Sequence, residues 1–303
     1  MSTEVQPDPS IIGNIAKPPF VRLPDPARLF ADRAARFRAL ATGHQLESSL
    51  KFLAGVSQVQ SDIQSGLPDV TIPTSDTLQR AKEHKMPPLD RSAFNPDPAF
   101  DQAFEWLLSA VEPLAMPTEA GAALARVKSI ERRARDMMVH NVLADAIPVE
   151  ELAEHIFVAA ALQVHYARVA VKLNPESLVE IGHGVCPTCG GAPASTMIVG
   201  WTGADGTRFC SCATCGTLWN YIRVQCTLCG SNKKMHYQEV EGSEGMIKAE
   251  ICEDCRGYVK MMYQQKNRDI EPIADDVASL GLDLLVQELG FRRGGVNPFL
   301  IGY

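Results

Sequence analysis

Two segments of the sequence repeat one pattern of cysteines and decide the fold of the second half of the chain. The first segment runs from Cys186-Pro-Thr-Cys189-Gly190 to Cys212-Ala-Thr-Cys215, and the second runs from Cys226-Thr-Leu-Cys229-Gly230 to Cys252-Glu-Asp-Cys255. Five positions of the first segment map onto the second with one constant offset of 40 residues. A constant offset of this kind indicates an internal duplication.

Each segment supplies two C-x-x-C pairs separated by 22 residues, which suits a hairpin that returns the second pair beside the first. Two residues between cysteines let both sulfurs reach one ion at about 2.3 Å, while backbone N–H groups of the turn point at the thiolates. We therefore predict two tetrahedral metal sites. The ligands are Cys186, Cys189, Cys212 and Cys215 in the first site, and Cys226, Cys229, Cys252 and Cys255 in the second.

The residue after each C-x-x-C pair supports this interpretation. Gly190, Gly216 and Gly230 follow the second cysteine of three pairs, where the chain often requires a positive φ. Arg256 takes this place in the fourth pair, and Gly257 comes one residue later. Because a small ribbon has little core of its own, we expect the loss of one ligand to unfold its own module and to leave the rest of the protein intact.

Metal binding is favoured over disulfides or free thiols, because all nine cysteines lie between Cys186 and Cys255 and two quartets are in register. A site closed by four cysteines has no open coordination position, which favours a structural ion over metal chemistry. Four thiolates in a tetrahedron suit zinc and iron alike. Cys210 is interpreted as a strand residue; the alternative is thiol exchange with the ligand set that includes neighbouring Cys212.

The first 180 residues are predicted to be helical after a proline-rich start that favours extended structure, either a tail or a docking strand. Four apolar faces recur at helical spacing. They are Phe30, Ala34, Phe37 and Ala41; Phe52, Val56, Val59 and Ile63; Phe100, Phe104, Leu107 and Val111; and Val127, Ile130, Ala134 and Met137. A further helix is expected to open at Glu150 and to close at Lys172, with acidic residues at its positive end.

Short β-branched runs separated by turn signals follow Pro175, and a last helix is expected from Asp269 to Gly290. Its apolar face consists of Ile273, Val277, Leu280 and Leu284. The predicted domains are an extended tail (1–26), a helical domain (27–180), two four-cysteine modules (181–220 and 221–268), and a C-terminal helix and tail (269–303).

Composition limits the classes of function. The net charge of -7 at pH 7 argues against a general electrostatic attraction to nucleic acid. The longest apolar run, Ile156 to Leu162, falls far short of the roughly 20 residues that a membrane span needs. The first thirty residues lack the pattern of a secretory signal, so we expect a cytoplasmic protein.

No residue pattern points to an active site. The sequence lacks the motifs G-x-x-x-x-G-K-S, G-x-S-x-G and H-E-x-x-H. His183 is interpreted as an exposed loop residue, and donation to a thiolate of the first site is the alternative. We therefore predict a protein that is not an enzyme.

The four cysteine pairs resemble those of the formate dehydrogenase accessory protein (FdhE) family. The similarity extends to both ends of the chain after about residue 18. The early match is Arg33-Ala-Ala-Arg36 to Leu40 with His44 and Leu46, and the late match is Ala274-Asp-Asp-Val-Ala-Ser-Leu280 with Gly294-Gly-Val-Asn-Pro-Phe-Leu300. Cys210 and Arg256 have no place in the pattern of the family.

The resemblance implies an α+β multidomain fold, in which an N-terminal all-α bundle precedes two tandem rubredoxin-like or zinc-ribbon metal modules and a C-terminal helix. It also implies a bacterial cytoplasmic protein that contacts the catalytic subunit of respiratory formate dehydrogenase before export. Iron is favoured by the resemblance, and zinc fits the same ligands. Two other classes remain open, a zinc-ribbon nucleic-acid-binding protein and a rubredoxin-like electron-transfer protein, and the oligomeric state is left undetermined.

Overall fold

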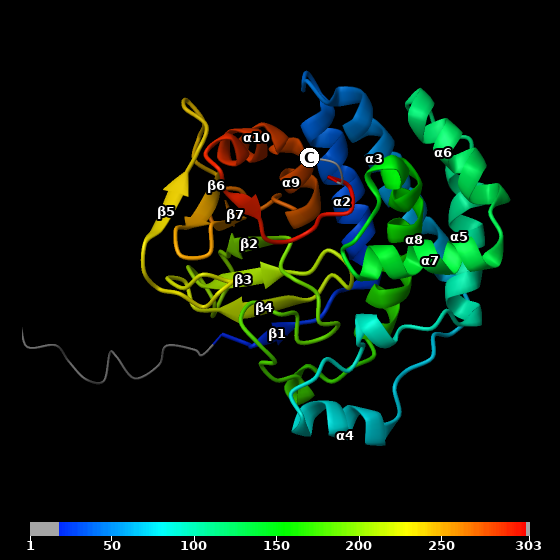
Figure 1. The fold of residues 1–303 in the computed structure, drawn as a ribbon, viewed down its shortest axis with the longest axis horizontal. Coiled ribbons are helices and arrows are strands. Elements are labelled where there is room, and N and C mark those ends of the chain that lie inside the picture. The colour runs from blue at the N-terminus through cyan, green and yellow to red at the C-terminus, as the bar shows by residue number, and fades with distance from the viewer. Residues whose placement is uncertain (1–17, 301–303) are drawn as a thin grey trace, which may run out of the picture.

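The computed structural model describes residues 18–300 and joins a group of helices to one mixed β-sheet (Figure 1). The helices of the N-terminal part are α2 (Pro26–Ala41), α3 (Glu47–Asp62), α4 (Ser75–Glu83), α5 (Pro98–Val111), α6 (Thr118–Ser129), α7 (Arg132–Leu143) and α8 (Leu152–Ala170). Side chains of Asp25, Thr74 and Asp97 cap α2, α4 and α5 by accepting backbone N–H groups of the first turn. The predicted α+β fold class is confirmed.

Helix α8 is the centre of the helical domain. Every residue from 157 to 167 is buried, and the helix packs against α3, α5, α6 and α7. The first three predicted apolar faces, which begin at Phe30, Phe52 and Phe100, are all buried in the core around it. A mostly apolar helix is expected at such a central position, whereas the surrounding helices bury one face each.

The fourth predicted face is confirmed at Val127 and at Ile130, which packs partly buried against the core, and it is wrong at its last two residues. Val127 is buried, but Ala134 is exposed and Met137 is 61% exposed. The helix ends at Ser129 and a new one begins at Arg132, because Ile130 adopts an extended conformation with ψ 148°. Because of this break, the positions of α7 that face the core differ from those predicted for one continuous helix. They are Met138, Val139, Val142 and Leu143.

The sheet contains the strands β1 (Val21–Arg22), β2 (Ser195–Ile198), β3 (Arg208–Ser211), β4 (Leu218–Tyr221), β5 (Met235–Gln238), β6 (Ile247–Cys252), β7 (Gly257–Tyr263) and β8 (Arg292–Arg293). Their order is β1-β4-β3-β2-β7-β6-β5, and β8 pairs with β7. Strand β1 belongs to the proline-rich segment that the sequence predicts as extended, and it docks on β4. Residues 1–17 of that predicted tail lie outside the described residues.

The internal duplication is visible in the strands. Strands β2, β3 and β4 correspond to β5, β6 and β7 with the same offset of 40 residues as the cysteines. Ser211 pairs with Leu218 in the first copy, and Ile251 pairs with Tyr258 at the equivalent positions of the second. The copies join side by side through the parallel pair β2–β7. The two modules therefore form one continuous sheet.

Two short helices replace the single C-terminal helix expected from Asp269 to Gly290. These helices are α9 (Pro272–Ala278) and α10 (Leu280–Glu288), with Ser279 between them. The Ser279 hydroxyl donates to the Asp275 carbonyl at 2.7 Å, and the ammonium of Lys260 donates to the Ser279 carbonyl at 3.0 Å. The break turns Leu284, which is 46% exposed, away from the core that the other predicted face residues reach.

Within residues 18–300, no helix combines the length and the apolar character that a membrane crossing requires. This agrees with the absence of a long apolar run in the sequence.

A buried polar network ties the helical domain to the C-terminal helices. The guanidinium of Arg33 donates to the Glu271 carboxylate at 3.0 Å and to the Gln163 side chain at 3.3 Å. Gln60 donates to the same Gln163 oxygen at 2.9 Å. Both members of the Arg33–Glu271 ion pair are nearly inaccessible to solvent. Because water cannot solvate either charge, each group relies on the other to compensate its charge.

We expect Arg33→Met to destabilise the protein by about 3 to 5 kcal/mol, because it leaves the buried carboxylate of Glu271 without a cation. Arg28→Met is the matched control, since its ion pair with Asp32 is solvent-exposed and should contribute less than about 1 kcal/mol. Urea denaturation followed by circular dichroism measures both free energies of unfolding. Equal effects of the two substitutions would contradict the role assigned to the network.

Candidate metal centres

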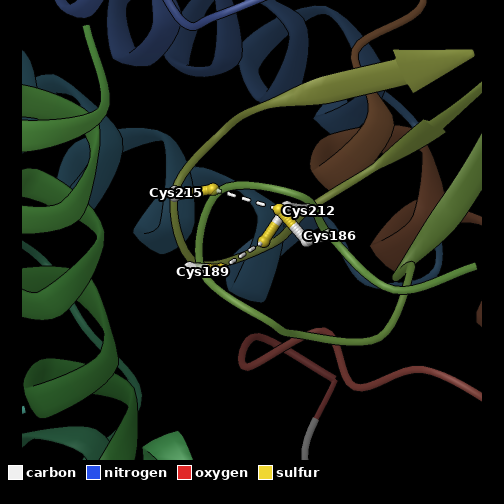
Figure 2. A group of neighbouring side chains, drawn as sticks. All are labelled: Cys186, Cys189, Cys212 and Cys215. Atoms are coloured by element: carbon white, nitrogen blue, oxygen red, sulfur yellow. Dashed lines mark hydrogen bonds between the residues drawn. The ribbon is translucent and has the colours of Figure 1, made fainter. Parts of the chain in front are cut away.

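The four cysteines of the first predicted site meet between two loops (Figure 2). This group, Cys186, Cys189, Cys212 and Cys215, is called site 1. The Sγ atoms of Cys186 and Cys215 are 3.6 Å apart, and those of Cys189 and Cys212 are 3.4 Å apart. Sulfurs bound tetrahedrally to one ion at 2.3 Å are separated by about 3.8 Å. The donor set and its spacing therefore fit a four-thiolate metal site.

The backbone of each C-x-x-C turn, called a knuckle, has the shape that the glycines predict. Gly190 donates its N–H to the Cys186 carbonyl at 2.9 Å, and Gly216 donates to the Cys212 carbonyl at 3.1 Å. Both glycines have positive φ values, 82° and 71°. At Gly216 a Cβ atom would also lie 2.7 Å from a terminal methyl group of Leu29 in α2, so a side chain there would displace Leu29 as well as strain the backbone.

Site 1 is covered by the helical domain. The backbone N–H groups of Leu89 and Arg91 donate to the carbonyls of Thr188 and Cys189 at 2.9 and 3.3 Å. On the other knuckle, the Gln163 side chain of α8 donates to the Ala213 carbonyl at 2.9 Å. All four ligands are at most 2% exposed. Loss of a site 1 ligand should therefore disturb the helical domain also, which revises the expectation of purely local unfolding.

Arg91 places a positive charge beside the thiolates of site 1. Burial opposes this charge, but hydrogen bonds to Asp145 and the charges of Cys189 and Cys212 hold the pKa of Arg91 above its usual value. A permanent cation there offsets part of the negative charge of four thiolates. Arg91 and Gln163 were missed by sequence analysis, because neither lies in a motif and both reach the site from distant segments.

The second predicted group also assembles, and it is called site 2. It consists of Cys226, Cys229, Cys252 and Cys255. Its sulfurs are spaced at 3.9 Å between Cys226 and Cys255 and at 3.8 Å between Cys229 and Cys252. These separations also fit one tetrahedral ion. In contrast to site 1, Cys229 and Cys255 are exposed to solvent.

Arg256 takes the glycine position of the fourth knuckle with a positive φ of 56°. Its guanidinium lies 4.0 Å from the ring centre of Phe291 and donates to the Leu289 carbonyl at 3.1 Å. These contacts attach the fourth knuckle to the end of α10. Attractive side-chain contacts of this kind offset the strain of a non-glycine residue in the left-handed region.

Cys210 and His183 lie outside both ligand groups. Cys210 is fully buried in β3, and burial raises the pKa of its thiol to about 12. It is thus a protonated core residue, in agreement with the strand interpretation. His183 is exposed, as expected, but it packs against Gly230 of site 2.

We expect Cys212→Ser to lower the metal content by one ion per chain, because serine replaces a thiolate ligand of site 1. Cys210→Ala, two residues away in the same segment, should retain two ions per chain. Elemental analysis of both purified variants gives the two stoichiometries. A loss of metal from the Cys210 variant would show that the ligand sets assigned here are wrong.

Comparison with known protein families finds matches along nearly all of the described residues. Three family models match in succession: "FdhE, N-terminal" over residues 18–183, "FdhE, central domain" over 185–223 and "FdhE, C-terminal domain" over 224–300. A "Protein FdhE homolog" from Rhizobium meliloti is 46% identical over 99% of this chain and 98% of its own length. A homolog from Edwardsiella ictaluri is 31% identical over 92% and 90% of the two chains.

A solved structure has the same fold. The crystal structure of the FdhE protein from Pseudomonas aeruginosa superimposes with a TM-score of 0.83 at 31% sequence identity. The match covers 93% of this chain and 99% of that chain. The similarity thus includes the helical domain and both cysteine modules.

Proposed function

The chain belongs to the FdhE family, and on that premise we propose that it is a cytoplasmic accessory protein of respiratory formate dehydrogenase. In this proposal it binds the catalytic subunit of the enzyme before export and assists its assembly or activation. The observation that carries the proposal is the similarity along residues 18–300, which includes the helical domain as well as the metal modules. A shared metal ribbon alone would support a much wider range of functions.

The ligand geometry supports a role without catalysis. Four thiolates fill the coordination sphere of a tetrahedral ion, so neither site offers a position at which formate could bind. In such a protein the ions stabilise the fold, and the chemistry belongs to the partner.

The surface of α10 supports binding of a protein partner. Leu284, Leu285 and Leu289 are 46%, 47% and 54% exposed, and Leu285 and Leu289 lie one helical turn apart. The helix is connected to site 2, because Arg256 of the fourth knuckle donates to the Leu289 carbonyl. Exposed apolar side chains in a cluster favour contact with another protein. We propose that this leucine face contacts the catalytic subunit.

Co-expression with the tagged catalytic subunit tests both proposals. We expect the two proteins to co-purify, and we expect Leu285→Glu with Leu289→Glu to weaken this association at least about tenfold, because two charges enter an apolar contact. Val149→Glu is the matched control, since Val149 is 75% exposed but lies in the helical domain.

The accessory function is wrong if the catalytic subunit does not co-purify and if formate oxidation in a deletion strain is unaffected. An electron-transfer role would then become the leading function, because Cys229 and Cys255 of site 2 are exposed to solvent. If the leucine variant still associates with the catalytic subunit, the contact surface lies elsewhere on the protein. The proposed accessory function would then stand.

We propose iron as the ion, from membership of the family, although zinc fits the same donors. Protein purified without oxygen should then be coloured and should contain about two iron atoms per chain, one in each four-thiolate site. Visible absorption and elemental analysis measure both properties. A colourless protein with two zinc atoms would exclude iron and would retain both sites.

A further inference from the structure

The two sites have the same ligands but different access to solvent. The four cysteines of site 1 are at most 2% exposed, whereas Cys229 and Cys255 of site 2 are exposed to solvent. From this difference we infer that the two sites are not equivalent. An ion bound in site 1 leaves only when the surrounding structure opens, whereas an ion bound in site 2 exchanges while the protein stays folded. The inference concerns the ions alone and does not rest on the proposed function.

Release from site 1 requires the helical domain to move. One knuckle is held by backbone hydrogen bonds from Leu89 and Arg91, and the other is held by Gln163 of α8. Gly216, which ends the second knuckle, is in contact with Leu29 of α2. Opening this site therefore breaks contacts with two helices and with the segment before α5, and such openings are rare in a folded protein.

The packing around site 2 leaves two of its four cysteines exposed to solvent. Leu228 fits against Gly257 and Gly294, so the third knuckle is attached to β7 and to the C-terminal segment. The Arg256 side chain attaches the fourth knuckle to the end of α10. Cys226 and Cys252 are 3% and 1% exposed, whereas Cys229 and Cys255 remain accessible.

Exchange at a four-thiolate site begins when an incoming ligand donates an electron pair to the ion. One metal–sulfur bond then breaks, and the released thiolate takes a proton from water. The incoming ligand must reach the ion, and only site 2 has cysteine residues that are exposed to solvent. The same exposure makes Cys229 and Cys255 the first cysteines that a thiol reagent can reach.

A chromophoric chelator distinguishes the two sites. Zinc-loaded protein is mixed with 4-(2-pyridylazo)resorcinol in native buffer, and zinc release is followed by absorbance. We expect one equivalent to be released at least about tenfold faster than the second, which should appear fully only when denaturant is added. Cys252→Ser should lose the fast phase, and Cys210→Ala should keep both phases. Release of two equivalents in one phase would overturn the inference.

Alkylation provides a readout that does not depend on any variant. The metal-loaded wild-type protein is treated with iodoacetamide for increasing times, and the labelled peptides are identified by mass spectrometry. Cys229 and Cys255 should be labelled before any ligand of site 1. If the protein is isolated with a single ion, the labelling pattern shows which site holds that ion. Protection of the site 1 cysteines from alkylation supports the inference, and protection of the site 2 cysteines overturns the inference.

Discussion

The convergence of Cys186, Cys189, Cys212 and Cys215 into one group of four thiols is the constraint on which the rest of the structure depends. The two knuckles contact different parts of the helical domain, one through Arg91 and the other through Gln163. An ion that holds the knuckles together therefore also holds those parts together. Its ligands belong to the main hydrophobic core rather than to a separate ribbon. Metal binding of this kind contributes directly to the free energy of folding.

The second module depends on the first because the sheet is continuous. Strand β7 of the second copy pairs with β2 of the first, and the buried ion pair of Arg208 with Glu250 joins β3 to β6. Helix α10 then packs against β6 of the second copy, and α9 packs against β2 of the first copy and against α2. The Arg33–Glu271 ion pair connects the segment before α9 to α2. Each copy alone is too small to bury a sufficient core, so the continuous sheet supplies what an isolated ribbon lacks.

The two groups of four cysteines and the duplication could be predicted from the sequence, because both are encoded by spacing along the chain. Three apolar helical faces were predictable for the same reason, since periodicity is local. The breaks at Ile130 and Ser279 were not predictable, because contacts such as that of Lys260 with the Ser279 carbonyl come from distant residues. The difference in exposure between the sites was also missed. It is produced by segments that precede the cysteines by many residues, such as the one that contains Arg91.

Arg256 shows how two copies with the same ligands can diverge. The equivalent position of the first copy is Gly216, where a Cβ atom would lie 2.7 Å from a methyl group of Leu29. Arg256 adopts the same left-handed backbone at a cost of about 1 to 2 kcal/mol. Its contacts with Phe291 and with the end of α10 offset this cost, and these partners exist only beside the second copy. Because both copies have the same pattern of four cysteines, neighbours of this kind are what would make the two groups hold an ion differently.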